Sequence, residues 1–358
     1  MRKLFDKTSI NQMELKNRFV RSATWEGLAN PDGSCGDKVT AMIEELALGQ
    51  VALIISSHAY VNPEGKGNNG QLGMHDDSLI ASYQKTVQVV QEKGSKIILQ
   101  ISHAGGRAIS QNPYGPSPTN IPGYQCREIT LAEIAKIIHD FKKAALRARK
   151  AGFDGIQIHA AHGFLLSQFL SPFFNKRKDY YGGSIENRAR IILEIVQIIR
   201  SELGNRFVIT IKINSDDFID GGFQPEEMIQ VSELLEKAGL DALEMSGGTS
   251  VGKYSSHRVN KDVLKGDEVY YRDAAKLFKE KINIPLILVG GIRSYEVARE
   301  LIEDDFADYI SLSRPLIREP YLIRRWQSGD TRRATCISCN KCFAPAREGK
   351  GLYCMLDK

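Results

Sequence analysis

The stretch 155-GIQIHAAHGFLLSQFL-170 joins a short apolar strand to an apolar helix and places two histidines at the junction. Ile156 to His159 alternate as the residues of a strand do, and the run after Phe164 has the composition of a helix. His159 and His162 stand three positions apart where the strand stops. Four interpretations are open for this pair: metal ligands, a proton relay, clamps on a substrate, or satisfied polar groups of the core.

The same strand–helix unit recurs from one end of the chain to the other. Most strand candidates are continuously apolar, as expected for strands covered on both faces. They are Phe19–Ser22, Val51–Ser56, Lys96–Ser102, Gly155–His159, Phe207–Ile213, Ala242–Ser246, Leu286–Gly290 and Tyr309–Ser313. Eight βα units without an obvious linker predict an α/β fold, a single (β/α)8 TIM barrel over residues 1–330. Residues 331–358 are expected to form a short cysteine-rich extension. A doubly wound sheet is the alternative, although it seldom needs eight regular units.

Helix boundary signals agree with this division of the chain. Thr130 with Glu133 three residues later is a capping box, and Pro225 suits a first helical turn. A further helix is expected to begin near Ser184. Three glycines are expected to end helices just before a strand: Gly94, Gly152 and Gly239.

Composition narrows the class of protein. The chain has 358 residues, 42% hydrophobic and 25% charged, with a net charge of +5 that is spread along it. No basic run interleaves with aromatic residues, so a nucleic-acid partner is not expected. No segment resembles a signal peptide or a membrane span, which predicts a cytoplasmic protein without a membrane partner.

In a (β/α)8 barrel, chemistry takes place at the C-terminal ends of the strands. The unusual polar residues of this sequence fall there. They are Ser22–Thr24, His58, Gln100, His103, His159, His162, Lys212, Ser246–Gly248, Gly290–Gly291 and Ser313–Arg314. Gly290, Gly291, Ser313 and Arg314 end the last two strands, where barrels frequently bind a phosphate. Tight-turn glycines and a surface ion pair are the alternative for these four.

Lys212 lies in 207-FVITIKINSDDF-218, on a strand that we expect to be buried. An unpaired buried ammonium is costly, so this side chain must reach the barrel mouth or pair with an anion. Three roles are open: a Schiff base with a carbonyl substrate, neutralisation of charge on a cofactor, or a structural ion pair with Asp216 or Asp217. The histidine pair lacks the spacing of a helix-borne zinc motif, which favours donors to a substrate oxygen.

The cysteines of 336-CISCNKC-342, together with Cys354, have the most specific spacing in the chain. C-x2-C-x2-C with a distal cysteine suits an iron–sulfur cluster, and a zinc site with four thiolates is a second interpretation. Plain structural thiols are the third. We therefore expect a [4Fe–4S] cluster or zinc at Cys336, Cys339, Cys342 and Cys354.

Several of these segments resemble the Old Yellow Enzyme family, the FMN-dependent NADH:flavin oxidoreductases built on a (β/α)8 barrel. The resemblance covers roughly residues 3 to 326. Its strongest anchor is 159-HAAHGFLLSQFLSPFFNKRKDYYGGSIENR-188. Further matches are 15-LKNRFVRSA-23, 100-QISHAGGR-107 and 310-ISLSRPLIREP-320, in the order that the family has them.

The resemblance implies an FMN over the barrel mouth and a role for each polar residue there. Ser22, Ala23, Thr24 and His58 would surround the flavin ring, and Gln100 would bond its pyrimidine side. Lys212 would stabilise the reduced flavin, in a position where the family commonly has arginine. Gly290, Gly291, Ser313 and Arg314 would hold the phosphate. His159 and His162 match the pair that grips a substrate carbonyl, and hydride would pass from NAD(P)H to an α,β-unsaturated carbonyl compound.

Two residues depart from the family pattern. Many members have tyrosine as a proton donor after the second histidine, whereas this chain has Phe164, which has no proton to give. Trp25 takes the place of a smaller residue and is expected to narrow the pocket.

The terminal cysteines resemble a branch that includes 2,4-dienoyl-CoA reductase and trimethylamine dehydrogenase, where such a run binds [4Fe–4S]. Those proteins continue into nucleotide-binding domains, so a cluster here is expected to need an external electron carrier. Family analogy also implies a homo-oligomer. An electron-transfer subunit and a Schiff-base lyase using Lys212 are the alternative functions.

Overall fold

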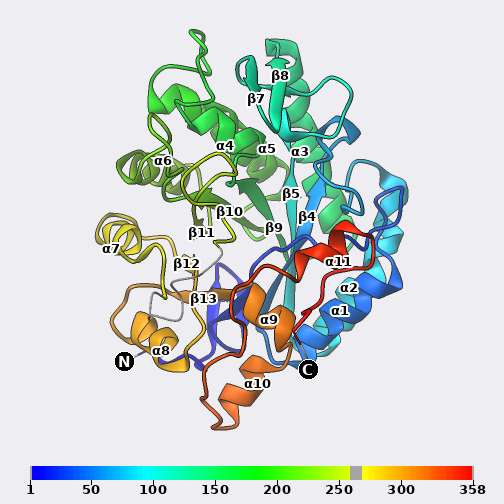
Figure 1. Cartoon of the computed structure of the whole chain (residues 1–358), viewed down its shortest axis with the longest axis vertical. Coiled ribbons are helices and arrows are strands. Elements are labelled where there is room, and N and C mark those ends of the chain that lie inside the picture. Colours follow the sequence, from blue (N-terminus) through cyan, green and yellow to red (C-terminus); the bar gives the residue numbers. More distant parts are fainter. Residues whose placement is uncertain (1, 259–267, 357–358) are drawn as a thin grey trace.

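The computed structural model describes residues 2–258 and 268–356, and its centre is a closed barrel of parallel strands (Figure 1). The strands neighbour one another in the order β10-β11-β12-β13-β3-β4-β5-β9. Their bounds are β3 (Phe19–Arg21), β4 (Leu53–Tyr60), β5 (Lys96–Ser102), β9 (Gly155–Ala160), β10 (Val208–Asn214), β11 (Ala242–Ser246), β12 (Leu286–Val289) and β13 (Tyr309–Leu312). All eight match the strands predicted from the sequence, and the (β/α)8 barrel is confirmed.

Helices surround the barrel on its outside (Figure 1). They are α1 (Asp37–Leu48), α2 (Ile80–Glu92), α3 (Leu131–Lys150), α4 (Leu165–Leu170), α5 (Ile185–Leu203), α6 (Pro225–Lys237), α7 (Arg272–Lys281), α8 (Tyr295–Glu303), α9 (Arg314–Arg318), α10 (Leu322–Gln327) and α11 (Phe343–Arg347). Three short 3-10 turns add η1 (Pro63–Gly65), η2 (Asp77–Leu79) and η3 (Gly105–Arg107). Every helix in the described part of the chain is too short or too polar to cross a bilayer.

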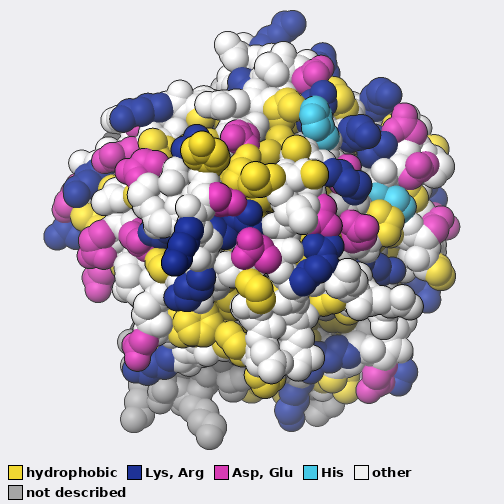
Figure 2. Space-filling model, turned by 90° about the horizontal axis from the view of Figure 1, so that it is seen from above, with side chains coloured by type: hydrophobic (Ala, Val, Ile, Leu, Met, Phe, Trp, Pro, Cys, Tyr) yellow, Lys and Arg dark blue, Asp and Glu magenta, His cyan; other side chains and the backbone are white. Residues whose placement is uncertain are grey.

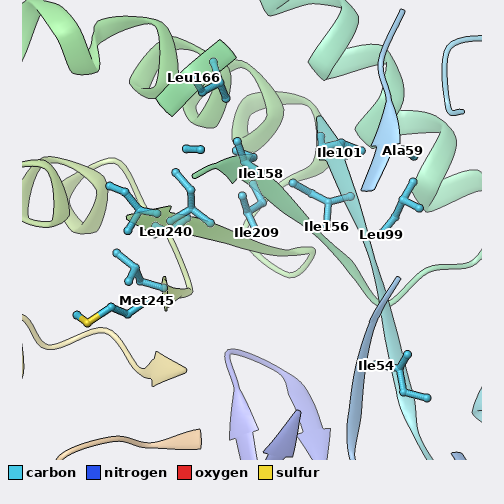
Figure 3. Packing of buried hydrophobic residues seen from close by; sticks show 14 of the residues in the cluster. Ile54, Ala59, Leu99, Ile101, Ile156, Ile158, Leu166, Ile209, Leu240 and Met245 are labelled. Atoms are coloured by element: carbon cyan, nitrogen blue, oxygen red, sulfur yellow. The ribbon is translucent and has the colours of Figure 1, made fainter. Parts of the chain in front are cut away.

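Successive side chains of a barrel strand point alternately toward the surrounding helices and into the barrel. The outward side chains form the apolar core, and the inward ones include residues of the candidate site. In β9, Ile156 and Ile158 belong to the main apolar cluster between strands and helices, which includes Leu166 of α4 (Figure 3). Gln157 lies between the two isoleucines in the sequence, is fully buried, and bonds to polar side chains inside the barrel. Side chains two apart share a face of a strand, so Gln157 and His159 both belong to the inner face.

A hairpin that the sequence did not predict closes the N-terminal end of the barrel. It pairs β1 (Thr8–Ile10) with β2 (Met13–Leu15) in antiparallel register. Ile10, Met13 and Leu15 join a second apolar cluster with strand residues such as Val20 and Ile98. This end is therefore filled with apolar side chains, which leaves the opposite end for polar chemistry.

The structure confirms the helix starts predicted at Thr130 and Pro225 and the helix ends predicted at three glycines. Thr130 accepts from the backbone of Glu133, whose carboxylate accepts from the Thr130 backbone, and Pro225 begins α6. Gly94, Gly152 and Gly239 follow helices with φ of 70°, 94° and 86°. Such left-handed conformations suit glycine because it has no Cβ.

Two features differ from the expected element pattern. β4 continues to Tyr60, past the predicted end at Ser56, because a register shift between Ile55 and His58 extends its pairing with β5. A small sheet of β6 (Tyr114–Gly115), β7 (Thr119–Ile121) and β8 (Tyr124–Glu128) forms within the excursion between β5 and α3. Basic and acidic side chains are interspersed on the face that Figure 2 shows, in agreement with the mild net charge.

The cysteine-rich extension runs back over the barrel after α10, and α11 (red in Figure 1) lies beside the strand ends. Phe343 and Arg347 of α11 reach the cavity at the mouth. Gly27 makes this approach possible, because a Cβ there would lie 2.7 Å from the carbonyl oxygen of Ala346. The extension therefore forms part of the wall around the mouth.

Candidate active site

A cavity of about 270 Å³ opens at the C-terminal ends of the barrel strands. Residues from well-separated parts of the sequence meet in its wall. Those predicted from the sequence are Ser22, Ala23, Thr24, His58, Gln100, His159, His162, Lys212, Ser246, Gly290 and Ser313. The barrel closure brings them together, because parallel strands all end at the same rim.

Gly291 and Arg314, the two remaining candidates for phosphate binding, line an adjoining cavity of about 70 Å³ together with Gly290 and Ser313. Gly290 and Gly291 have φ of 132° and 80°, a backbone conformation that suits glycine, and the rings of Tyr271 and Tyr270 lie close to where a Cβ would stand. Arg314 Nη1 donates to the carbonyl oxygens of Arg258 and Ser338 and to Asn340 Oδ1. Part of the guanidinium therefore also holds the segments around Arg258 and around Ser338 and Asn340 next to this cavity.

His162 is held in a left-handed backbone conformation, with φ of 62°. Its amide donates to Asn214 Oδ1 at 3.1 Å, and its carbonyl oxygen accepts from Arg107 Nη1 at 3.1 Å. Its Nε2 lies 2.8 Å from the Ser246 hydroxyl. A non-glycine residue in this region costs energy and persists where surrounding contacts fix it, as is common at functional sites. Both backbone groups of His162 are fixed in this way.

His159 lies deeper in the wall and is only 3% exposed. Its ring centroid is 5.3 Å from that of His162 and 4.5 Å from that of Phe164. Its Nδ1 is buried without a hydrogen-bond partner. Buried polar atoms are nearly always paired, so this nitrogen has capacity for an atom of a bound molecule.

Burial keeps the histidines of the mouth uncharged. It lowers the pKa of His159 and of His162 well below the usual value, and the positive charges of Lys212 and Arg107 act in the same direction. Burial also lowers the pKa of His58 to about 4. A neutral imidazole has one N–H donor and one acceptor, so each ring of the pair has one proton to offer to an oxygen.

Lys212 is buried, and its partners correct one expectation. Its ammonium lies 3.3 Å from the carboxylate of Glu244 and donates to Ser22 Oγ at 2.6 Å. The structural ion pair with Asp216 or Asp217, one of the three roles left open by the sequence, does not form, and Glu244 is the carboxylate partner instead. The two aspartates follow the end of β10, whereas Glu244 is the register neighbour of Lys212 on β11. Burial lowers the pKa of Lys212 and Glu244 raises it.

A buried polar network extends from Lys212 across the barrel interior, and the sequence reasoning missed most of it. Gln100 Nε2 donates to Gln157 Oε1 at 2.7 Å, and Gln157 Nε2 donates to Glu244 Oε2 at 3.0 Å. Ser311 donates to the other oxygen of Glu244 at 2.7 Å. The sequence did contain a signal for this network, namely single polar residues within otherwise apolar strands. When both faces of a strand are covered, the side chain of such a residue must find a polar partner.

The two residues that depart from the family pattern both line the cavity. Phe164 is 7% exposed, and its ring lies against His58 and His159. Trp25 donates through Nε1 to the carbonyl oxygen of Asn69 and packs against the cluster of Cys342, Ala346 and Leu352. Trp25 thus joins the mouth to the cysteine-rich extension.

Further residues of the wall were not singled out from the sequence, among them Asn68, Arg107, Ser256, His257, Tyr271, Phe343 and Arg347. Arg107 stands in the QISHAGGR match, but nothing in the spacing identified it as a cavity residue. Phe343 and Arg347 come from the extension, between Cys342 and Cys354. Only the path of the folded chain reveals that they reach the mouth.

The four C-terminal cysteines line one small cavity of about 20 Å³. Ser338 and Asn340 have φ of 56° and 61°, which turns the chain between them. Arg318 Nη1 donates to Cys354 Sγ at 3.1 Å. Within residues 2–258 and 268–356, no three or more His, Cys, Asp or Glu side chains lie in an arrangement that could hold a metal. The cysteines are thus gathered, but not in a ligand geometry.

A separate cavity of about 560 Å³ lies between α1, α9 and the C-terminal segment, with Arg21, Glu45 and Arg318 in its wall. Of the residues predicted for a site, it includes Cys354 alone. The smaller cavity at the strand ends has the buried histidines and Lys212. We therefore take the cavity at the strand ends as the candidate active site.

Comparison with known proteins identifies the family of the chain. The model of the NADH:flavin oxidoreductase / NADH oxidase family matches residues 3–332. The chain is 36% identical over 346 residues to NADH oxidase of Thermoanaerobacter brockii, covering 94% of this chain and 52% of the relative. It thus spans about half the length of that protein.

Two solved structures share its architecture. 2-Naphthoyl-CoA reductase, in complex with 2-naphthoyl-CoA, superposes with a TM-score of 0.93 and 27% identity, covering 99% of this chain and 57% of that one. Morphinone reductase in complex with tetrahydroNAD gives a TM-score of 0.77 and 25% identity, covering 92% of each chain. The match of residues 3–332 spans the barrel with the histidine pair and Lys212. The chain is therefore a member of the NADH:flavin oxidoreductase / NADH oxidase family.

Proposed function

We propose that this protein is an FMN-dependent oxidoreductase that takes hydride from NAD(P)H and reduces the double bond of an α,β-unsaturated carbonyl compound. The observation that carries the proposal is the pair of buried, uncharged histidines in a cavity that Lys212 and the glycine-ended strand β12 also line. Two similar proteins support it, since the morphinone reductase structure contains tetrahydroNAD and the 2-naphthoyl-CoA reductase structure contains 2-naphthoyl-CoA.

The donor set of the mouth fits FMN. Gln100 and Lys212 would meet the pyrimidine side of the ring, and Ser22, Ala23, Thr24 and His58 its edges. Gly290, Gly291, Ser313 and Arg314 would bind the phosphate through backbone N–H groups and a guanidinium. When bound, FMN supplies hydride transfer between nicotinamide and substrate. Lys212, held charged by Glu244, would favour negative charge at the pyrimidine end.

His159 and His162 would bind the substrate carbonyl oxygen. Each neutral ring offers one N–H, and two donors on one oxygen draw electron density from the conjugated double bond. The Ser246 hydroxyl and the two backbone bonds hold His162 in place for this contact. Because such donors meet charge that develops during the reaction, they stabilise the transition state more than the bound substrate.

Reduction of the double bond also requires a proton on the α-carbon of the substrate. Many family members deliver it from a tyrosine, but this chain has Phe164 at that position. The Phe164 ring centre lies 4.5 Å from that of His159, but the ring has no ionisable group. We infer that water supplies this proton. Turnover with simple enones is then limited by the protonation step.

We further propose that Cys336, Cys339, Cys342 and Cys354 hold a [4Fe–4S] cluster, with zinc as the competing occupant. Their convergence on one small cavity supports this, together with spacing that suits four thiolates on a cluster. Side-chain rotation is required, since the thiols are not in ligand geometry. An external electron carrier would exchange electrons with such a cluster. A cluster that exchanges electrons with an external carrier is also what an electron-transfer subunit needs, and such a subunit is the second candidate function.

The absorption spectrum of anaerobically purified protein tests both metal and flavin proposals. We expect flavin bands, a broad iron–sulfur contribution, and NADH oxidation that accelerates when 2-cyclohexenone is added. A colourless protein that does not bind added FMN contradicts the proposed function. The electron-transfer subunit is favoured instead if flavin reduction needs a protein carrier and turnover of NADH is negligible. Size-exclusion chromatography separately tests the proposed homo-oligomer.

Lys212 also allows a test of the Schiff-base lyase. Burial lowers its pKa, which favours a nucleophilic amine, but the Glu244 carboxylate and the Ser22 hydroxyl both engage its ammonium. Borohydride with substrate should therefore leave the protein mass unchanged. A stable adduct at Lys212 supports the lyase instead.

A further inference from the structure

The wall of the mouth cavity is basic without an acidic counterpart. Among the lining residues of the described chain, Arg107, Lys212 and Arg347 are cationic and none is Asp or Glu. Lys212 has its own carboxylate in Glu244, which lies beneath the cavity wall. Arg107 and Arg347 have no carboxylate within ion-pair distance among residues 2–258 and 268–356. Two cations of the mouth are thus left without an anion.

Arg107 stands on the side of the cavity where the histidine pair lies. Its guanidinium carbon is 5.5 Å from the ring centre of Phe164 and 5.6 Å from that of Tyr124. Its Nη1 donates to the His162 carbonyl oxygen. Two aromatic faces and one hydrogen bond orient the planar fork, and a guanidinium has five N–H donors in all. Donors therefore remain for a second group beside Phe164.

Arg347 stands at the rim, exposed to solvent and at the last turn of α11. Its neighbours in the wall include the ring of Phe343, which packs 5.4 Å from that of His257. Burial is the main cause that lowers the pKa of His58, His159, His162 and His257, and the positive charge of Arg107 acts in the same direction on all four. Arg107 and Arg347 thus place positive charge at two points of the cavity wall, one beside the histidine pair and one at the rim.

We infer that the substrate carries a carboxylate remote from the carbonyl that the histidines bind, and that Arg107 recognises this carboxylate. This inference rests on the proposed function. The fork of Arg107 suits a bidentate contact with a carboxylate, and the ring of Phe164 packs near both the guanidinium and the His159 ring. Arg347 attracts the anion at the rim. The substrate class is thus an unsaturated carbonyl compound with a distal carboxylate.

Two phenols of equal shape test the inference on the FMN-loaded protein. 4-Hydroxybenzoate has a carboxylate opposite its phenol oxygen, and 4-hydroxybenzamide has a neutral amide there. Dissociation constants are measured from the change in flavin absorbance. We expect the carboxylate to bind about ten-fold more tightly, because charge-assisted hydrogen bonds are about twice as strong as neutral ones. Raising the salt concentration should reduce this preference where Arg347 at the rim contributes.

Arg107→Gln should remove the preference, and Arg107→Lys should restore part of it. Arg149→Gln, which removes an exposed arginine of α3 at the other end of the barrel, is the matched control and should keep the full preference. Equal binding of the two phenols by the wild-type protein overturns the inference and leaves the proposed function intact. So does an unchanged preference in Arg107→Gln.

The anion that Arg107 binds could also be the diphosphate of the coenzyme. The KM for NADH distinguishes this diphosphate from a substrate carboxylate. If Arg107→Gln raises that KM while the preference for 4-hydroxybenzoate persists, Arg107 binds the coenzyme and the inference is wrong. If neither phenol perturbs the flavin spectrum at all, the proposed function fails and the inference fails with it.

Discussion

At the scale of single residues, the site depends on the protonation state of His159 and His162. Burial and neighbouring cations keep both rings neutral, so each offers one N–H to an oxygen. His159→Ala and His162→Ala should each weaken binding of a phenolic ligand about ten- to hundred-fold and leave FMN bound. Titration of flavin absorbance measures the affinity, and the protein-bound FMN content is the control.

His162 needs a second variant because its backbone is left-handed. Alanine is strained in this region, whereas glycine adopts it freely and has no side-chain donor. His162→Gly should therefore keep the local backbone conformation and still lose affinity. Unchanged affinity in this variant and in His159→Ala would refute the role of the pair as substrate donors.

Phe164 is the residue where the chain lacks a proton donor. Phe164→Tyr should raise the turnover of 2-cyclohexenone about ten-fold or more, because a positioned general acid contributes at least that much to protonation. Phe164→Leu serves as the control, since it changes the ring without adding a hydroxyl. Equal turnover of Phe164→Tyr and the wild type would show that another group already delivers the proton.

Glu26 is a buried carboxyl whose ionisation opposes folding. Burial raises its pKa to about 7, while Arg21 acts in the lowering direction. The folded state therefore keeps a proton that the unfolded state releases near the usual value of 4.5, so stability falls as pH rises from about 4.5 to 7. Glu26→Gln should be more stable than the wild type by roughly 1–3 kcal/mol at pH 8 and nearly equal at pH 4.5.

Urea unfolding at the two pH values measures this difference. Glu14→Gln, an exposed carboxyl of the N-terminal hairpin, is the control and should change stability little at either pH. A gain for Glu26→Gln that is the same at both pH values would show that packing rather than ionisation is responsible.

At the scale of elements, the barrel helices depend on their caps. Thr130 and Glu133 satisfy two otherwise unpaired amides at the start of α3, and Arg127 pairs with the same Glu133. Thr130→Ala should lower the free energy of unfolding by about 1 kcal/mol, and Thr130→Ser should lower it by less. FMN affinity should stay constant, because this helix start is not part of the cavity wall. Equal stability of all three proteins would contradict the capping role.

At the scale of the whole molecule, the cysteine-rich extension joins the barrel mouth to the proposed cluster. Cys342 immediately precedes α11, and α11 contributes Phe343 and Arg347 to the cavity wall. The double variant Cys336→Ser and Cys339→Ser should lose bound iron, about four atoms per chain in the wild type, while FMN remains. Iron and flavin analysis of anaerobic protein measures both quantities.

Cys126→Ser is the control for this double variant, because Cys126 lies in β8, away from the four C-terminal cysteines. Its iron content should equal that of the wild type. Zinc in place of iron in the wild-type protein would contradict the cluster and leave the four-thiolate site standing. Loss of FMN together with iron would show that the extension is needed to hold the flavin cavity together.

The sequence by itself determined the barrel and the polar residues of its mouth. Continuous apolar strands must be covered on both faces, and eight of them separated by helices have one regular solution. His159, His162 and Lys212 stood out because buried polar groups need partners, and strand ends face one rim. Local signals such as the capping box at Thr130 also follow from a few neighbouring residues.

The tertiary structure alone decided which groups meet. Glu244 is the partner of Lys212 because β10 and β11 are in register, whereas its sequence neighbours Asp216 and Asp217 lie beyond the strand. Arg107, Phe343 and Arg347 reach the cavity only through the paths of a loop and of the C-terminal extension. Contacts between distant segments depend on barrel closure and register, and these are not encoded in any single stretch of sequence.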